Sequence, residues 1–400
     1  MLLRSFCCLL FFCFLPVILH AAPSEQGGTD PTVQIDRLVE GAIARGAIAG
    51  GVVLVGNGRE TLFERAYGRT SLVLDAGPVL TDTIFDLASL TKVLATTPAI
   101  LKLAEERRLS LVDPVTKWLP EFAGKGKDEL LILHLLTHTS GLDDFSFKEA
   151  APRQSAIAGA AAERLKGEIG SRFHYADINF ILLGEIISRV TGEELDRYAA
   201  KTFYQPLGMS DTGFRPTPDK ATRCAPTLSG ENAWLTGLPQ DYPARQLGGV
   251  AGHAGVFSTA RDLGTFCRML LHEGEWLGKR VLAPRTVRQM TAPYFSRGGR
   301  VMRGLGWDMA SPFSSPKGNG FSEVSFGHTG YSGSSLWIDP EANLFVVLLT
   351  TRLEYKKLSE ISQLRAEVSS LAAKLFAPAT VAKKEAAVPS LRAANTVKYR

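Results

Sequence analysis

The chain has 400 residues, 45% of them hydrophobic, which predicts one or two globular domains with a large buried core. Its formal net charge is +5, but Arg4 supplies one charge, and residues 377–400 hold five basic side chains against one acidic one. The rest of the chain is therefore neutral on this count, and a nucleic-acid partner is not indicated.

The two ends of the chain differ in composition from its centre. Arg4 precedes an apolar stretch over residues 5–19 that ends close to two alanines, a pattern typical of a secretory signal peptide. We therefore expect residues 1–22 to be a cleaved signal peptide and the protein to be periplasmic or secreted. An uncleaved inner-membrane anchor is the alternative, because Pro23 lies close to the junction. Residues 377–400 are expected to form a disordered basic tail with weak attraction to anionic envelope surfaces.

The spacing of apolar residues and turn residues predicts the elements between these ends. In chain order they are a helix over 31–45, strands over 51–68 with an Asn-Gly turn, a helix after residue 89, helices near 128–138, 152–165, 179–191, 193–203 and 258–272, strands near 323–328, 333–339 and 343–351, and a helix over 357–376. No βα unit repeats, so we expect an α+β fold in which an antiparallel β-sheet is flanked by terminal helices and carries an inserted helical domain.

This fold divides residues 23–376 into two predicted subdomains. The sheet subdomain is expected over about 30–88 and 245–376, and the helical subdomain over about 89–244. We expect the active cleft to lie between them.

The stretch Ser89-Leu90-Thr91-Lys92 places a hydroxyl and an amine three residues apart, at the start of a predicted helix with apolar residues around most of its circumference. A buried lysine there is costly without a partner, and an amine beside a serine is a recognised way to activate it for acyl transfer. The alternative is an N-cap serine followed by a solvated lysine. A second Ser-x-x-Lys at residues 314–317 lies among Pro and Gly and is interpreted as a surface turn.

Two later segments, Tyr175-Ala176-Asp177 and His328-Thr329-Gly330, follow at the order and approximate spacing of known motifs. With Ser89-Leu90-Thr91-Lys92 they resemble the serine β-lactamase and penicillin-binding protein superfamily, and most closely its class C β-lactamase-like branch with D-alanyl-D-alanine carboxypeptidases and esterases. Residues 85–88, 134–142 and 248–255 are similar to that branch as well. The resemblance covers about residues 32–352.

The resemblance implies a role for each motif residue. Ser89 would be acylated, and Lys92 and Tyr175 would share the proton transfers. Backbone N–H groups of Ser89 and Tyr331 would hold the oxyanion. Gly330 would allow the substrate to approach an edge strand closely.

Two positions depart from the commonest family pattern. Asp177 replaces an asparagine, so it cannot donate a hydrogen bond to a penicillin side chain, and its charge favours the ammonium form of Lys92. We therefore expect Lys92 to orient and Tyr175 to act as the base. His328 replaces a lysine, and capture of a substrate carboxylate should strengthen as the pH falls through about 6.5. Asp177, His328, Thr329, Gly330 and Tyr331 form the expected cleft lining.

Other polar clusters do not predict a metal or cofactor site. His134 and His138 are four apart, but no third ligand follows at a zinc spacing, and this segment is interpreted as a helix end. No nucleotide fingerprint or Gly-x-Ser-x-Gly elbow is present. His253 lies in a glycine-rich segment, and a cleft-lining role is left open. Cys224 and Cys267 are either bridged or isolated thiols.

The leading hypothesis is an exported serine hydrolase that acts through a Ser89 acyl-enzyme. Its expected activity is that of a D-alanyl-D-alanine carboxypeptidase on peptidoglycan stem peptides, or on a related small amide or ester. An esterase or a β-lactamase on the same scaffold is the first alternative. A non-catalytic penicillin-binding or sensor protein is the second.

Overall fold

The computed structural model describes residues 30–72, 76–228, 233–295, 302–352 and 358–377. The predicted signal peptide, and the predicted tail beyond its first residue, lie outside this part of the chain. Within the described ranges, no helix combines the length and apolar character needed to cross a bilayer.

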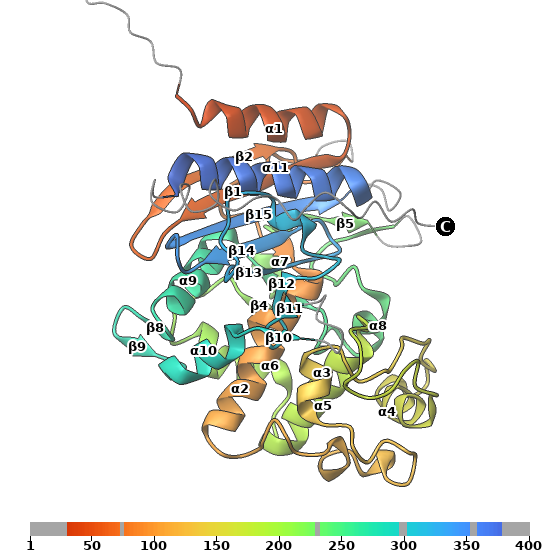
Figure 1. Cartoon of the computed structure of the whole chain (residues 1–400). Helices are drawn as coiled ribbons and strands as arrows, with labels where there is room; N and C mark the ends of the chain where they lie inside the picture. The colour runs from red at the N-terminus through yellow and green to blue at the C-terminus, as the bar shows by residue number, and fades with distance from the viewer. Residues whose placement is uncertain (1–29, 73–75, 229–232, 296–301, 353–357, 378–400) are drawn as a thin grey trace, which may run out of the picture.

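An eight-stranded antiparallel sheet forms the centre of the molecule, with strand order β10-β11-β12-β13-β14-β15-β1-β2 (Figure 1). Its strands are β1 (Ile48–Gly56), β2 (Thr61–Gly68), β10 (Tyr294–Phe295), β11 (Met302–Arg303), β12 (Asp308–Ala310), β13 (Phe326–Thr329), β14 (Ser335–Asp339) and β15 (Leu344–Arg352). The predicted α+β class with an antiparallel sheet is confirmed.

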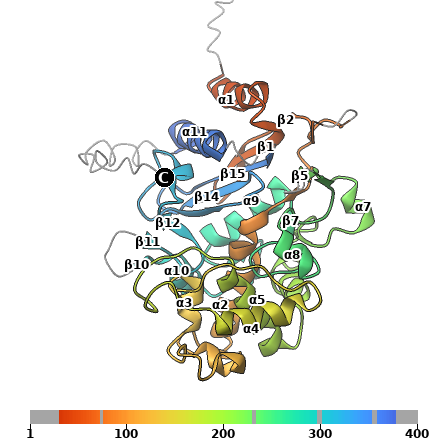
Figure 2. The same cartoon turned by 90° about the vertical axis from the view of Figure 1, so that its right-hand side faces the viewer.

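Side chains of the long strands point alternately into two hydrophobic cores, one on each face of the sheet. On β1, Val53 and Val55 face a core with the terminal helices α1 (Val33–Ala44) and α11 (Leu358–Phe376), whereas Val52 and Leu54 face a larger core on the other side. Successive side chains of a β-strand point to opposite faces of the sheet, so this alternation is typical of a strand that is buried on both faces. Figure 2 shows α1 and α11 near each other on the same side of the sheet.

The opposite face carries α9 (Ala260–Leu271) and the remaining helices. These are α2 (Thr97–Glu105), α3 (Ile132–Leu136), α4 (Pro152–Ala162), α5 (Ile178–Thr191), α6 (Leu195–Ala199), α7 (Pro218–Ala221), α8 (Tyr242–Gln246) and α10 (Pro284–Thr291). Short strands form a sheet β3-β7-β4 and two pairs: β3 (Phe85–Asp86), β4 (Gly213–Phe214), β5 (Thr227–Leu228), β6 (Trp234–Leu235), β7 (Val256–Ser258), β8 (Glu275–Trp276) and β9 (Lys279–Arg280).

Two predicted helices differ from the structure. The helix expected near 128–138 is reduced to α3, because Leu131 is extended and forms a bridge with Pro114. The helix expected over 193–203 begins as α6 and continues as a π-helix over Ala200–Tyr204. The predicted helical segment also contains the short strands β4, β5 and β6.

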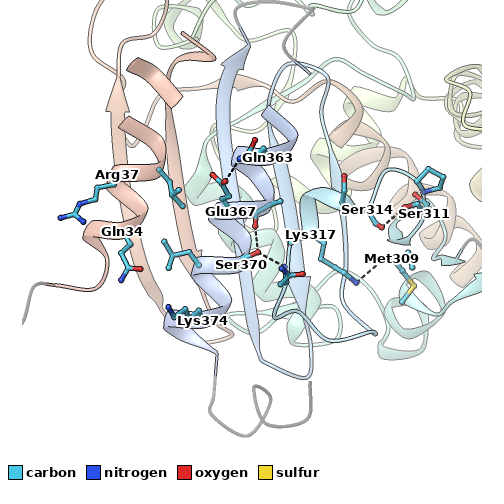
Figure 3. A pocket seen from close by; sticks show the side chains of 18 residues that line it. Gln34, Arg37, Met309, Ser311, Ser314, Lys317, Gln363, Glu367, Ser370 and Lys374 are labelled. Atoms are coloured by element: carbon cyan, nitrogen blue, oxygen red, sulfur yellow. Dashed lines mark hydrogen bonds between the residues drawn. The ribbon is translucent and has the colours of Figure 1, made fainter. Parts of the chain in front are cut away.

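A groove of about 1020 Å³ lies between α1, α11 and the segment from Met309 to Asn319 (Figure 3). Polar side chains of both helices, among them Gln34, Gln363 and Glu367, line it. None of the predicted catalytic residues does, so this groove is separate from the candidate active site.

Candidate active site

The nucleophile lies on a tight turn directly after β3. Ser89 is half-buried in a 3-10 turn over Ala88–Leu90, and a π-helix over Lys92–Thr96 connects it to α2. Ala88 has a φ of 46°, which is strained for a residue with a Cβ. Asp86 supports this turn, since its carboxylate accepts the N–H of Ala88 at 2.9 Å and that of Gln240 at 2.7 Å. Burial raises the pKa of Asp86 to about 6, although these two N–H groups act in the opposite direction.

Lys92 is fully buried, so the alternative of a solvated lysine is wrong. Its Nζ lies 3.0 Å from Ser89 Oγ, 2.6 Å from Asp177 Oδ1 and 3.3 Å from the carbonyl oxygen of His253. Burial lowers the pKa of Lys92, but the charge of Asp177 and the neighbouring Tyr175 together raise it above its ordinary value. Lys92 is therefore an ammonium group near neutral pH.

Tyr175 lies just before α5, and Lys92 Nζ lies 5.0 Å from the centroid of its ring. Its ring stacks on His138 at a centroid distance of 4.4 Å and contacts the half-exposed Phe313 at 5.3 Å. Burial raises the pKa of Tyr175, and the positive charge of Lys92 offsets only part of this effect. The phenol therefore keeps its proton at neutral pH. It can accept a proton from Ser89 only if it gives its own proton to another group in the same step.

Asp177 is the residue before α5, where it faces Lys92. Its backbone N–H donates to the Asp144 carboxylate at 3.1 Å, and that of Ile178 does so at 2.9 Å. These bonds satisfy two N–H groups at the helix start. Burial and the charge of Asp177 raise the pKa of Asp144.

His328 lies on β13 and is buried. Its Nδ1 is 2.8 Å from the carbonyl oxygen of Thr329, so Nδ1 carries the proton and donates it. Burial, with the charges of Arg303 and Lys92, holds the pKa of His328 well below 6.5. The expected gain of charge near pH 6.5 is therefore wrong: His328 is neutral, and it is not a cationic anchor for a carboxylate.

The turn after β13 lies directly against the nucleophile turn. A Cβ on Gly330 would be 2.4 Å from the carbonyl oxygen of Leu87, and Ser332 Oγ donates to the carbonyl oxygen of Asp86 at 2.6 Å. The protein's own backbone therefore already requires a glycine here. β13 also lies between β12 and β14 rather than at the sheet edge, although Gly327 alone pairs with β12.

The other predicted cleft residues lie on the same turn. Thr329 is half-buried, and Tyr331 is 51% exposed. The structure thus brings Ser89, Lys92, Tyr175 and Asp177 into direct contact. His328 is near Tyr175, with a ring-centroid distance of 6.2 Å.

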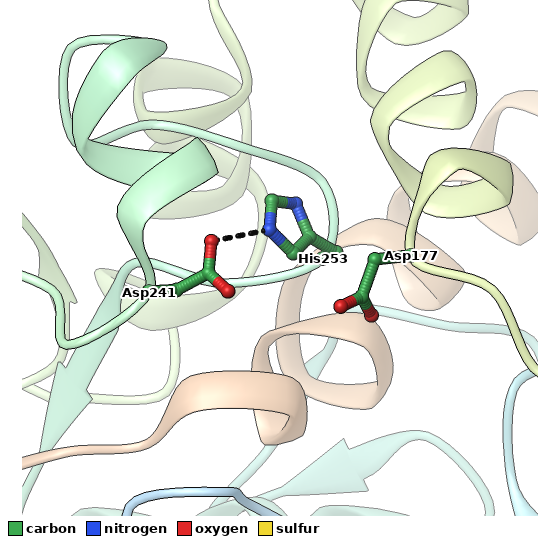
Figure 4. Close-up of side chains that lie close together, drawn as sticks. All are labelled: Asp177, Asp241 and His253. Carbon is green, nitrogen blue, oxygen red and sulfur yellow. Dashed lines mark hydrogen bonds and ion pairs between the residues drawn. The ribbon is translucent and has the colours of Figure 1, made fainter. Parts of the chain in front are cut away.

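Three further groups were missed or left open by the sequence reasoning. Arg365 on α11 donates to three carbonyl groups of the turn after β13. Asp241 and His253 form an ion pair at 2.7 Å beside Asp177 (Figure 4). The only sequence signal for this pair is that Asp241 precedes His253 of the glycine-rich segment. That order along the chain does not show that the two side chains meet.

Ligand atoms of Asp177, Asp241 and His253 lie within 4.8 Å of one another, a spacing that a metal ion could use. Asp177 is already paired with the Lys92 ammonium, and Asp241 with His253, so the contacts favour an ion-pair network. His134 Nδ1 instead accepts the N–H of Leu131.

The two cysteines of the described chain are separate from this site. Cys224 and Cys267 are buried free thiols, which settles the question of a bridge between them.

Comparison with known proteins places this geometry in a family. A model of the family described as Beta-lactamase matches residues 35–369. The "Putative D-alanyl-D-alanine carboxypeptidase" of Escherichia coli (strain K12) is 30% identical over 383 residues, covering 84% of this chain and 86% of that protein. An N-acetylmuramyl-L-alanine amidase of Bacillus subtilis (strain 168) is 30% identical over 381 residues, covering 84% of each chain.

Solved structures show the same fold. A penicillin-binding protein homologue from Caulobacter crescentus superimposes with a TM-score of 0.72 at 24% identity, covering 87% of this chain and 98% of its own. EstCE1, a hydrolase with promiscuous acyltransferase activity, has a TM-score of 0.69 at 24% identity, covering 85% and 98%. The family match over most of the sequence, joined to this shared fold, shows that the chain belongs to the Beta-lactamase family of serine hydrolases.

Proposed function

We propose that this protein is a serine amidohydrolase that cleaves peptidoglycan-derived peptides through an acyl-enzyme on Ser89. The observation that carries the proposal is the hydrogen-bonded series from Ser89 Oγ through Lys92 Nζ to Asp177, with contacts of 3.0 and 2.6 Å. Export through the predicted signal peptide over residues 1–22 belongs to the proposal, because cell-wall peptides lie outside the cytoplasm.

The raised pKa of Tyr175 and the position of Lys92 between Ser89 and Asp177 replace the expected base, Tyr175, by a proton relay through Lys92 to Asp177. Ser89 Oγ attacks the carbonyl carbon as its proton passes to Lys92, and Lys92 passes one of its own protons to Asp177. Backbone N–H groups of Ser89 and Tyr331 stabilise the oxyanion. The Tyr175 phenol gives a proton to the leaving nitrogen and takes one from Lys92, and Lys92 takes back the proton held by Asp177, which restores the ammonium–carboxylate pair. Water then releases the acyl group.

Two amide bonds of a muramyl pentapeptide are candidates. The first is the terminal D-alanyl-D-alanine bond, which the name of the Escherichia coli relative supports. The second joins N-acetylmuramic acid to L-alanine, as the name of the Bacillus subtilis relative indicates. The neutral His328 favours the second bond, because a substrate cleaved there presents no terminal carboxylate to the reacting centre.

An esterase or a β-lactamase would use the same acylating groups. Asp177 weakens the β-lactamase alternative, because its carboxylate accepts hydrogen bonds but does not donate one to the side-chain amide of a penicillin. We therefore expect slow acylation by benzylpenicillin.

One substrate tests both candidate bonds. Muramyl pentapeptide ending in D-alanyl-D-alanine is incubated with wild type and Ser89→Ala, and the products are weighed by mass spectrometry. Loss of one alanine supports the first bond, and separation of the sugar from the intact peptide supports the second. Absence of both products with wild type, or their formation by Ser89→Ala, would contradict the proposal.

A further inference from the structure

A second buried ion pair lies beside Lys92 and Asp177. Asp241 is the N-cap of α8, where its Oδ1 accepts the N–H of Ala244 at 2.8 Å. His253 lies between α8 and β7, and its Nε2 is 2.7 Å from the same oxygen (Figure 4). The His253 side chain is 1% exposed, so this pair acts on the reaction through other residues rather than by touching substrate.

The segment that carries His253 is fixed to the nucleophile helix. The His253 carbonyl oxygen accepts Lys92 Nζ at 3.3 Å, and the Gly252 carbonyl oxygen accepts Thr96 Oγ1 at 2.6 Å. A Cβ on Gly252 would lie 1.9 Å from the carbonyl oxygen of Phe180, so only glycine allows this approach to α5. A shift of His253 would therefore also move an acceptor of Lys92.

The charges around His253 come from four elements. Asp241 faces it from α8, Asp177 from the start of α5, Lys92 from the nucleophile helix, and Asp144 from the segment after α3. Two carboxylates with oxygens this close repel each other unless each has a cation. Lys92 neutralises Asp177, and a protonated His253 neutralises Asp241.

The titration of the pair agrees with this arrangement. Burial lowers the pKa of His253, but the charge and hydrogen bond of Asp241, joined by the charge of Asp177, raise it above 6.5 overall. Burial raises the pKa of Asp241, yet His253 lowers it to about 2. Both groups are therefore charged from about pH 2 up to the pKa of His253.

We propose that His253 and Asp241 are positioning residues whose charges act on the neighbouring Lys92–Asp177 pair, so that loss of the imidazolium proton accelerates acylation of Ser89. A positive imidazolium beside Asp177 stabilises its carboxylate and weakens it as a proton acceptor. Removing that charge strengthens the acceptor at the end of the series. This inference rests on the proposed function of Ser89.

The proton balance of the step is simple. The O–H bond of Ser89 breaks and an N–H bond forms on Lys92, while another N–H bond of Lys92 breaks and an O–H bond forms on Asp177. The ammonium is regenerated in the same step, and the serine oxygen bonds to the carbonyl carbon. His253 neither gives nor takes a proton during turnover.

The kinetic test is the pH dependence of kcat/KM with p-nitrophenyl acetate as the probe. For wild type we expect kcat/KM to rise with pH through an inflection above the ordinary histidine value of about 6.5. Asp241→Asn removes the counter-ion and should move the inflection down by about one pH unit or more. His253→Gln should abolish it. His134→Gln, which changes a histidine outside the site, is the control and should keep the wild-type profile.

A second measurement does not depend on turnover. Ring-nitrogen NMR of histidine-labelled Ser89→Ala protein reports the protonation of His253 directly, with His253→Gln as the assignment control. We expect a doubly protonated ring at pH values where free histidine is already losing its proton, and a lower titration point in Asp241→Asn. A neutral His253 ring, or the same kinetic inflection in wild type and both variants, would overturn the inference. Hydrolysis of the probe by Ser89→Ala at the wild-type rate would instead overturn the proposed function. The NMR measurement of His253 protonation would remain valid in that case, because it does not depend on turnover.

Discussion

Arg365 offers the sharpest test of how the fold supports the oxyanion site. This residue of α11 is 6% exposed, and its guanidinium donates to the carbonyl oxygens of Gly330 at 2.6 Å, Ser334 at 2.9 Å and Gly333 at 3.0 Å. The same turn carries the Tyr331 N–H that is expected to bind the oxyanion. Arg365→Met keeps much of the aliphatic volume and removes all three bonds.

The size of the effect follows from these contacts. A hydrogen bond to a charged group contributes about 1.5 kcal/mol or more, so three of them predict a loss of about 4.5 kcal/mol or more in the free energy of unfolding. Displacing one oxyanion donor lowers kcat by about 10² to 10³. We expect kcat of Arg365→Met to fall by roughly 10²-fold, with a change in KM below about 3-fold, because the donor acts mainly in the transition state.

The assay measures kcat and KM for Ser89-dependent hydrolysis, together with urea unfolding. Arg261→Met is the matched control, because Arg261 is 60% exposed and pairs with Glu64 at the surface. Such a pair contributes at most about 1 kcal/mol, and kcat should not change. A folded Arg365→Met protein with the wild-type kcat would refute the role of Arg365 in holding the turn.

Three further predictions address the site. Asp177→Asn removes both the charge that favours the ammonium form of Lys92 and the proton acceptor of the proposed relay, so the pKa of Lys92 falls, kcat/KM drops and the pH–rate profile moves; an unchanged profile would show that Lys92 and Asp177 are not coupled. Phe313→Ala removes a half-exposed ring beside Tyr175, and KM should rise several-fold while kcat stays within about 2-fold, as steady-state kinetics would show. Asp86 has a folded pKa of about 6, above its ordinary 3.8. Its stabilising effect is complete below about pH 4 and is lost as the pH rises through about 6, so urea unfolding should show wild type losing about 3 kcal/mol relative to Asp86→Asn over this range. A constant difference would contradict the raised pKa.

Local patterns were sufficient for most of the sheet. Alternation and turn residues predict a strand over 343–351, and β15 spans Leu344–Arg352. The helix expected near 128–138 failed because Leu131 is held extended by a bridge to Pro114, a contact that periodicity does not show.

The candidate site likewise contains some contacts that the sequence predicts and others that it does not. The spacing of Ser89 and Lys92 predicts their contact, which holds although the turn is 3-10 and then π-helical rather than α-helical. The charge of His328 could not be predicted, because burial decides it. Arg365 lies on an amphipathic helix, where sequence alone does not distinguish a buried guanidinium from a solvated one. The contact between His253 and Asp241 exists only because α8 and the following segment fold back on each other.

The most direct test of the central claim is the site of covalent labelling by a fluorophosphonate, read from the intact mass and then from peptide mapping of wild type and Ser89→Ala. We predict one adduct per wild-type chain, on the peptide that contains Ser89, and none on Ser89→Ala. An adduct at another residue, equal labelling of Ser89→Ala, or no labelling of folded wild type would contradict Ser89 as the nucleophile.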